Sequence, residues 1–348
     1  MSKSSQTLQE DASINEFFSL VATETLALFE YLEFEFLSDF DVFAPSRRGR
    51  TRDHHPPELF RAFLHCYYND IYGVRPVARE LQNTIVWFSC GFDRPPSRDA
   101  VDRFLTDLEH VVEEVFDCLV EQAATRGLLD MTYRIDSTDV RAMPADPDAS
   151  KCYDPTAEEH YYGYGCTIVS TGAKIPIAAE FTESKQASEE TAMRVTRDAL
   201  AVAHPIWMVG DSAYDTLDWH DFLLTAGVVP VAPYNPRNTD DPLEIEYRVE
   251  ARIENHGEDV QLKRSVLDET YNRRSQVERT NEAVKDCGLG TLRARGCVHA
   301  RAQVFLGLCL RLVVAITNYE RGDNPGSTVI TVCGLFYDIL CTVTVKYH

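Results

Sequence analysis

Lysine is scarce in this chain of 348 residues: only seven of its 34 basic residues are lysines, and the other 27 are arginines. Its 55 acidic residues give a formal net charge of −21 at pH 7, which taken alone argues against a nucleic-acid partner because phosphate contact needs cations. An acid-rich, lysine-poor composition is also typical of proteins from a high-salt cytoplasm, so we expect a halophilic source. At roughly 1 M salt the Debye length falls to about 3 Å, so diffuse repulsion is screened while direct arginine to phosphate contacts survive in part. The alternative is an ordinary acidic enzyme without a polymeric substrate.

Paired cysteines and long apolar runs are also missing. The ten cysteines occur singly, without a Cys-x-x-Cys pair or a zinc-like histidine spacing, which predicts a reducing cytoplasm and no structural zinc. Residues 1–16 are polar, so no secretion signal is expected. The longest apolar stretch, residues 304–316, contains Arg311 and is short for a membrane span, which predicts a buried helix and no membrane association.

Residues 1–128 are expected to form a mainly helical domain that binds DNA ends. Apolar residues at helical spacing between residues 10 and 41 predict one or two amphipathic helices. A basic loop follows, and we interpret it either as a solvated linker or as an arm that contacts DNA. Its candidate DNA-binding residues are Arg47, Arg48 and Arg50.

Two short helices are predicted next, over residues 57–69 and 75–82, separated at Gly73. This pair suits a helix-turn-helix over about residues 57–83, although plain helical bundles contain such pairs too. Ser97 is then placed to cap a long helix that runs to Arg126.

Residues 129–322 are expected to form an α/β domain, because the pattern becomes β-like after Gly127. A hairpin is followed by alternating helix and strand, which indicates a mixed sheet. An acid-rich insertion is expected over residues 237–269, a helical segment over 278–319, and a C-terminal tail of unknown role over 323–348. The expected strands are 132–135, 164–169, 175–179, 206–209 and 228–231, with a helix over 188–203.

A group of four side chains, Tyr271, Arg274, Glu278 and Lys285, recurs at steps of three, four and seven residues. On a helix these side chains share one face. Such a face places a carboxylate that can hold a divalent metal beside cations that can hold phosphates. The alternative for Glu278 alone is an exposed ion pair with Arg274, which contributes only about 0.3 to 0.5 kcal/mol.

Two further carboxylates, Asp136 and Asp211, are expected where the chain leaves a strand. Ligands of α/β sheets bind beyond the carboxyl ends of strands, so the two would face one crevice if their strands are neighbours. With Glu278 they form a set of hard oxygen ligands suited to two Mg²⁺ or Mn²⁺ ions. Each aspartate alone is better explained as a turn or capping residue, and Asp139, Asp215 and Glu282 are nearby alternatives to the three carboxylates.

These motifs together resemble the DDE transposases of prokaryotic insertion sequences, especially those with a Tyr-x2-Arg-x3-Glu-x6-Lys helix. The match lies in that helix, in Ile135-Asp136-Ser137-Thr138 and in Gly210-Asp211-Ser212-Ala213-Tyr214-Asp215, in the same order along the chain. Gly165 departs from the pattern, since a basic residue often follows Gly-Tyr in this hairpin. The apolar tail after Val332 is also longer than is usual.

The resemblance implies a ribonuclease-H-like catalytic domain with two divalent ions at Asp136, Asp211 and Glu278. It implies cleavage at transposon ends, transfer of the freed 3′-OH into target DNA, and a homodimer in the DNA complex. It also implies that Arg274 and Lys285 hold phosphates, with Tyr271 packed near them. The neighbouring Arg273 and Arg279 belong to a basic island in residues 271–301, where seven cations face three acids.

Two other functions remain open from the sequence. One is a nuclease of the same fold that cuts without joining DNA. The other is a degenerate transposase that survives as a DNA-binding regulator, against which the intact set of three carboxylates argues.

Overall fold

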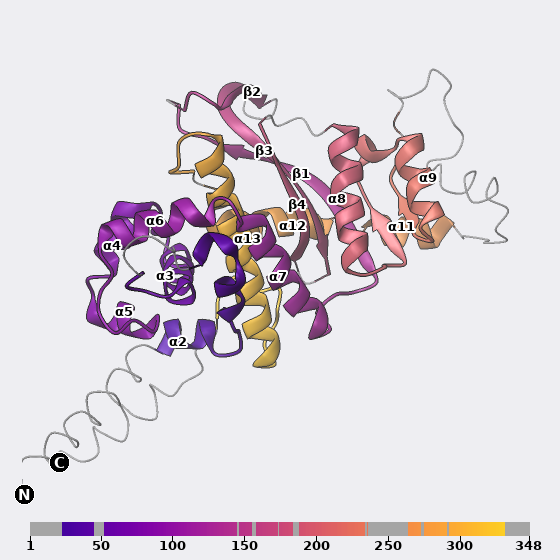
Figure 1. Cartoon of the computed structure of the whole chain (residues 1–348). Coiled ribbons are helices and arrows are strands. Elements are labelled where there is room, and N and C mark those ends of the chain that lie inside the picture. The colour runs from indigo at the N-terminus through magenta and orange to yellow at the C-terminus, as the bar shows by residue number, and fades with distance from the viewer. Residues whose placement is uncertain are drawn as a thin grey trace, which may run out of the picture. The chain divides into compact units, whose positions relative to one another are not determined.

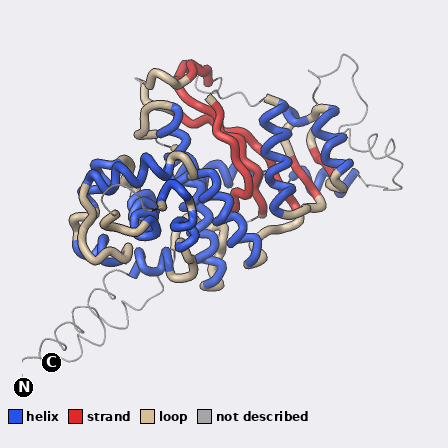
Figure 2. The backbone as a smooth tube through the Cα atoms, viewed as in Figure 1, coloured by secondary structure: helices blue, strands red, loops and turns tan. Residues whose placement is uncertain are grey.

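The chain divides into two compact units, each described here separately: the first comprises Met1–Leu105 and Val313–His348, and the second comprises Thr106–Leu312. In the second unit the strands gather into one sheet, whereas the described elements of the first are helices (Figures 1 and 2). The computed structural model describes residues 23–44, 52–144, 146–154, 158–172, 174–183, 188–233, 235, 264–272, 275–290 and 292–330.

The helices predicted around Gly73 are confirmed. Helix α3 (Pro56–Tyr68) begins with proline in its first turn and with a capping box between His55 and Glu58. Gly73 has a φ of 86°, a conformation that glycine adopts without strain, and it ends the connection before helix α4 (Val74–Glu80). Helix α5 (Thr84–Ser89) follows at once.

The expected helices between residues 10 and 41 are shorter than predicted where the structure describes them. Helix α2 (Thr23–Phe29) ends early, and two 3₁₀ turns follow at Glu35–Asp39 and Asp41–Phe43. Arg52, at the end of the predicted basic loop, donates to the Val42 carbonyl oxygen at 2.8 Å and lies over the Phe43 ring. Arg47, Arg48 and Arg50 lie outside the described residues.

The long helix predicted from residue 97 to 126 is wrong, because the chain forms helix α6 (Arg98–Leu108) and helix α7 (Val112–Thr125). The predicted cap is present, since the Ala100 amide donates to Ser97 Oγ at 3.2 Å. Between the helices, the carbonyl oxygen of Glu109 accepts a hydrogen bond from Arg301 at 3.0 Å. The break therefore coincides with a carbonyl group that a distant side chain satisfies instead of the helix.

The sheet of the second unit has the mixed order expected of a ribonuclease-H-like fold. β1 (Thr132–Arg141) pairs antiparallel with β3 (Glu159–Thr171) and parallel with β5 (Trp207–Val209), which pairs parallel with β6 (Val229–Val231). β4 (Ile175–Thr182) and β2 (Ser150–Asp154) pair antiparallel with the edge of β3 that does not face β1. Gly163 shows the two edges, since it pairs with Arg141 of β1 on one side and with Ser150 of β2 on the other. The predicted fold class, a mixed α/β sheet flanked by helices, is confirmed.

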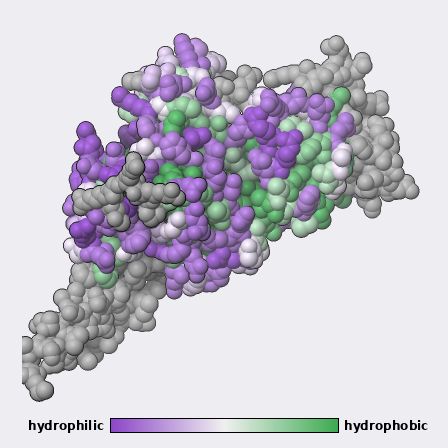
Figure 3. Space-filling model, viewed as in Figure 1, coloured by the Kyte–Doolittle hydropathy of each residue, from purple (hydrophilic) through white to green (hydrophobic). Residues whose placement is uncertain are grey.

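Helices cover both faces of this sheet. Helix α8 (Glu189–Val202), capped as predicted by Ser188 Oγ accepting from the Thr191 amide, packs against β3 and β4. Helix α12 (Ser275–Val284) packs against β1 and lies behind the sheet in Figure 1. Helix α9 (Leu217–Thr225) packs against β6. In Figure 3 most described residues on the visible face are hydrophilic, and apolar ones gather beside α8 and α9.

Two segment predictions need correction. Residues 264–269, assigned to the acidic insertion, belong to helix α11 (Arg264–Asn272), while residues 236–263 lie outside the described part of the chain. The helix predicted from residue 278 to 319 is interrupted. A π-helical turn at Lys285–Leu289 contains Gly288 with a φ of 113°, and helix α13 begins only at Cys297.

Helix α13 (Cys297–Glu320) confirms the predicted buried helix. It is long and apolar enough to cross a membrane, but 94% of its most apolar window is buried within the protein, as expected of a core helix. Arg311 is fully buried there and donates from Nε to the Lys174 carbonyl oxygen at 3.0 Å. The eight cysteines of the described residues are all free thiols.

Candidate active site

Asp136 lies within β1 and not at its end, which corrects the prediction. The pairing of β1 with β5 stops at Arg134 and Val209, but its pairing with β3 continues to Arg141. Asp136 therefore stands just beyond the carboxyl end of the parallel pair, where ligands of α/β sheets bind. Its Oδ1 accepts a hydrogen bond from the Ser137 amide at 2.9 Å, and its Oδ2 accepts one from the side chain of Asn281 at 2.8 Å.

Asp211 follows β5 as predicted, separated from it by Gly210. Its Oδ1 accepts a hydrogen bond from the Ala213 amide at 2.8 Å and caps a 3₁₀ turn at Ser212–Tyr214. The alternative interpretation of Asp211 as a capping residue is thus confirmed. It occupies one carboxylate oxygen and directs the side chain beyond the end of the strand.

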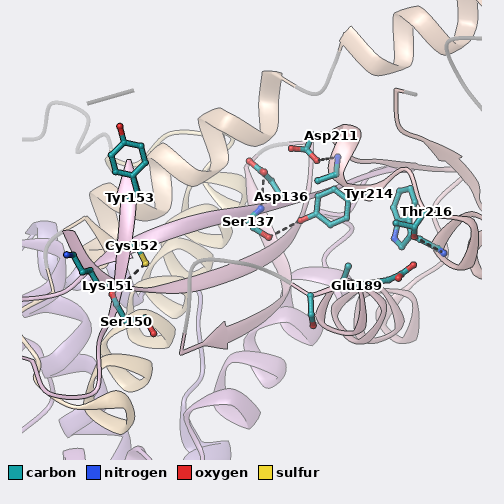
Figure 4. A pocket seen from close by; sticks show the side chains of 14 residues that line it. Asp136, Ser137, Ser150, Lys151, Cys152, Tyr153, Glu189, Asp211, Tyr214 and Thr216 are labelled. Atoms are coloured by element: carbon teal, nitrogen blue, oxygen red, sulfur yellow. Dashed lines mark hydrogen bonds between the residues drawn. The ribbon is translucent and has the colours of Figure 1, made fainter. Parts of the chain in front are cut away.

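Asp136 and Asp211 line one pocket of about 620 Å³ between β1, β2, α8 and the turn after β5. Figure 4 shows the two carboxylates at the same end of this pocket. The expectation that both aspartates face one crevice is therefore met in the structure. The pocket is also lined by Ser137, Ser150, Lys151, Cys152, Tyr153, Ser188, Glu189, Ala192, Ala213, Tyr214, Thr216 and Trp219.

A chain of hydroxyl groups holds the two aspartate motifs together. Ser137 Oγ lies 2.9 Å from the Tyr214 hydroxyl and 2.8 Å from Thr167 Oγ1 on β3. Burial, together with the charges of Asp136 and Asp211, raises the pKa of Tyr214 well above its usual value, so the hydroxyl stays protonated. A Cβ at Gly210 would approach the Tyr214 side chain to 2.9 Å, which explains glycine before Asp211.

The third motif reaches the sheet through helix α12. Glu278 belongs to this helix, but its side chain lies outside the described residues. Asn281, one turn further on, is 8% exposed and makes the hydrogen bond to Asp136. Ser170 Oγ on β3 also donates to Thr280 Oγ1 at 3.4 Å. These contacts join helix α12, which contains position 278, to β1 and β3.

The predicted single face from Tyr271 to Lys285 spans three described segments. Tyr271 lies in the last turn of α11 and packs against a cluster formed by Val209 of β5, Val231 of β6 and Leu267 of α11. Lys285 opens the π-helical turn, and its Nζ lies 3.6 Å from Asp139 Oδ1. Arg279 is exposed on α12, while Arg273 and Arg274 lie outside the described residues.

Asp139 stands opposite Gly165, the position of the departure noted from the sequence. The two residues are paired across β1 and β3, so a basic residue at 165 would stand opposite this carboxylate. Here its cations come from elsewhere, since Lys285 lies near one oxygen and Arg141 Nε lies 3.6 Å from the other.

The other alternative carboxylates also have identifiable environments. Asp215 is fully buried, lies 3.2 Å from His220 Nε2, and accepts the Asn235 amide at 2.8 Å. It therefore connects the second motif to the following loop and does not line the pocket. Glu282 is exposed on α12.

The residues present suit a divalent metal. Asp136 and Asp211 bring hard oxygen ligands, the kind that Mg²⁺ and Mn²⁺ prefer, to one pocket. Within the described ranges no three side chains from His, Cys, Asp and Glu cluster as a complete metal site. The side chain of the third predicted ligand, Glu278, lies outside the described residues.

Sequence reasoning missed two contributors to this site. Asn281 carries no metal-binding signature, although its position one turn after Glu278 places it on the same face. The contact of Ser137 with Tyr214 was also missed, although both residues stand inside the two aspartate motifs. Only the pairing of β1 with β5 brings them together.

Comparison with known proteins gives consistent matches. Residues 131–313 match the family model described as "Transposase DDE domain". Two curated proteins described as "Probable transposase for insertion sequence element ISH11", from two strains of Halobacterium salinarum, are each 82% identical over 326 residues, covering 94% of this chain and 99% of the relative. Among solved structures, the piggyBac transposase synaptic complex with hairpin DNA aligns with 90% of this chain and 75% of its own, at 13% identity and a TM-score of 0.44.

Proposed function

Because this chain belongs to the DDE transposase family and is a transposase of the insertion-sequence type, we propose that Asp136, Asp211 and Glu278 are its catalytic carboxylates. One observation carries the proposal. The two aspartates line one pocket, and helix α12, to which Glu278 belongs, is tied to Asp136 through Asn281. These contacts support a common site for three motifs that are far apart in sequence.

The three carboxylates would hold two divalent ions, Mg²⁺ or Mn²⁺. When bound, such ions supply activation of the attacking oxygen and stabilisation of the leaving oxygen in a phosphodiester displacement. The rest of the site acts on the ligands themselves. Asn281 fixes the orientation of the Asp136 carboxylate, and the Ala213 amide fixes that of Asp211.

The reaction is cleavage at the transposon ends followed by transfer of the freed 3′-OH into target DNA. The relatives described as insertion-sequence transposases support this reaction. The basic island supports a DNA partner, because Arg279, Arg293 and Arg295 are exposed although the chain as a whole is strongly acidic. Lys285 would hold a phosphate of the transposon end and Arg274 another, with Tyr271 packed beside them; Arg273 would add a further contact.

The helical region of residues 1–128 would bind the terminal inverted repeats of the element. The pair α3 and α4 supports this, since it forms two helices joined through Gly73 as a helix-turn-helix requires. The basic segment with Arg47, Arg48 and Arg50 would add phosphate contacts. Two ends must be cut together, so we propose a homodimer in the DNA complex, acting in the cytoplasm.

The decisive experiment uses Asp136→Asn, Asp211→Asn and Glu278→Gln with DNA carrying the ends that flank this gene. Each variant should keep its far-ultraviolet circular dichroism spectrum and its end binding, yet lose Mg²⁺-dependent cleavage. Cleavage retained by all three would refute the catalytic assignment. Wild-type end binding without any metal-dependent turnover would indicate the regulator instead.

A joining assay separates the transposase from a nuclease of the same fold. Pre-nicked ends with a free 3′-OH are incubated with supercoiled target DNA and Mg²⁺, and joined products are scored on a gel. The transposase should form joined products that the Asp136→Asn variant does not form. A nuclease would cut the fully paired ends and leave pre-nicked ends unjoined.

A further inference from the structure

One face of the ribbon formed by β2 and β3 presents four side chains of related chemistry: Lys151, Tyr153, His160 and Tyr162. Across the two strands Lys151 pairs with Tyr162, and Tyr153 pairs with His160. Directly paired residues project to the same side of an antiparallel ribbon, as do residues two apart on one strand. The four side chains therefore form a continuous patch, the tyrosine face.

The tyrosine face is open to solvent. Tyr153 is 51% exposed and Tyr162 is 42% exposed, and the Tyr153 and His160 rings lie 5.1 Å apart in a tilted arrangement. Lys151 is also exposed and, among the described residues, has no carboxylate within ion-pair distance. Protection of an edge strand from aggregation accounts for a lysine but not for two exposed aromatic rings beside it.

Three acidic side chains near this ribbon contact one arginine, Arg141. Arg141 lies 2.6 Å from Asp154 Oδ2, 2.7 Å from Glu159 Oε1 and 3.6 Å from Asp139 Oδ2. The same guanidinium group lies over the Tyr161 ring on the buried side of the ribbon. Asp154 and Glu159 pair with each other, one residue along from Tyr153 and His160, so they project to the opposite side of the ribbon. The charge of Lys151 on the tyrosine face is therefore available to an anion.

The tyrosine face is continuous with the candidate active site. Lys151 and Tyr153 line the pocket that contains Asp136 and Asp211. Figure 4 shows β2 at one side of the pocket and the two aspartates at the other. A strand bound at the aspartates would therefore have its next nucleotides within the reach of this ribbon.

We propose that the tyrosine face binds unpaired nucleotides of the DNA strand next to the phosphodiester that is cut, an inference that rests on the proposed function. The tyrosine rings stack on bases, and Lys151 holds a phosphate. Bases inside a duplex are stacked on each other, so only unpaired bases offer a free ring face. Stacking does not depend on counterion release, which suits an acidic protein whose phosphate contacts weaken at high salt.

The test measures binding of a short fluorescent oligothymidylate by anisotropy, at several KCl concentrations and without divalent metal. Replacing both rings (Tyr153→Ala with Tyr162→Ala) should weaken binding roughly five- to a hundred-fold, with the ratio to wild type unchanged across the KCl series. Tyr153→Trp should keep wild-type affinity. Tyr319→Ala removes another exposed tyrosine, 42% accessible on α13, and should have no effect.

The failure of this inference differs from failure of the proposed function. Asp136→Asn should abolish cleavage and leave oligothymidylate binding intact, so the ribbon is tested even if no DNA is cut. Equal affinity of wild type and the double alanine variant would overturn the inference. An altered molecular mass of the double variant in analytical ultracentrifugation, with oligothymidylate affinity unchanged, would instead identify the face as a contact between protein copies.

Discussion

The side-chain amide of Asn281 donates a hydrogen bond of 2.8 Å to Oδ2 of Asp136, and this contact joins the helix of the third acidic motif to the strand of the first. The two residues are 145 positions apart in the chain. An amide is neutral and donates through its nitrogen, so it can hold a carboxylate in one orientation without competing for its negative charge.

Replacing Asn281 with alanine should leave the protein folded and shift the Mg²⁺ dependence of cleavage. The expected loss is roughly 10- to 100-fold in metal affinity or in activity, because a group that orients a ligand is removed. Cleavage rates measured over a Mg²⁺ titration would show the shift. Asn281→Asp replaces the amide with a carboxylate, and at low Mg²⁺ this variant should cleave more slowly than Asn281→Ala. An unchanged titration curve for both variants would contradict the positioning role.

Lys285 must leave Asp139 if it is to hold a phosphate of the DNA. Lys285→Ala should therefore weaken binding to transposon-end DNA and reduce the salt slope of that binding by about one unit. Asp139→Asn should strengthen binding, because it removes the competing negative charge 3.6 Å from the ammonium group. Anisotropy titrations at several KCl concentrations measure both effects. The assignment fails if Lys285→Ala alters neither affinity nor slope.

The buried Tyr214 hydroxyl should contribute to stability through its contact with Ser137. Tyr214→Phe should lower the free energy of unfolding by about 0.5 to 1.5 kcal/mol, the usual net value of such a hydrogen bond. Urea denaturation followed by circular dichroism measures this change. Ser137→Ala should cost a similar amount, and the double variant should cost less than the sum of the two.

The raised pKa of Tyr214 adds a pH dependence with a definite sign. The folded protein keeps this proton at pH values where the unfolded chain loses it, so the stabilisation is complete below about pH 10. Stability should then fall as the pH rises further, and Tyr214→Phe should show a weaker decline than wild type. Identical slopes above about pH 10 would argue against this contribution.

A second acidic group lines a groove of about 590 Å³ between α7, α8 and β4. Partial burial, with Asp198 and Glu114 nearby, raises the pKa of Asp117 to about 6. The folded state therefore binds this proton more tightly than the unfolded chain does. The associated stability is present below the usual aspartate pKa and is lost as the pH rises through about 6.

Asp117→Asn should raise the thermal midpoint at neutral pH and flatten its dependence between about pH 4 and about pH 7. Scanning calorimetry of the two proteins over this range gives the comparison. The exposed Asp39→Asn is the matched control, since it removes one negative charge outside the groove. A shift of equal size in both variants would show a general charge effect and not the environment of Asp117.

The sequence predicted that the two aspartates face one crevice, but it misplaced the end of the first strand. Asp136 was expected at the end of the strand Tyr133-Arg134-Ile135. Pairing with β3, which no local pattern reveals, extends β1 to Arg141. The two aspartates still line one pocket, because this depends on where Asp136 lies relative to β5 and not on how far β1 extends. The helix break after Leu108 contains neither glycine nor proline, and its partner Arg301 comes from far along the chain.

The predicted face of four residues shows the same limit. Helical spacing predicted a shared face for Glu278 and Lys285, and the resemblance placed that face near the aspartates; Lys285 does lie near Asp139 of the first motif's strand. Periodicity could not show that Tyr271 would pack beside β5 and β6 in a separate described helix. Nor could it show that Lys285 would find Asp139, because ion pairs depend on which strands become neighbours.

The kinked turn that begins at Lys285 packs against the buried helix α13, so α13 helps to fix the position of this turn. A Cβ at Gly307 of α13 would lie 2.7 Å from the carbonyl oxygen of Cys287, so this residue accepts no side chain while the kink keeps its position. One added methyl group at position 307 would press on the turn that ends the helix of the third motif. A substitution at this glycine would therefore displace Lys285 from its position beside Asp139 without changing either residue.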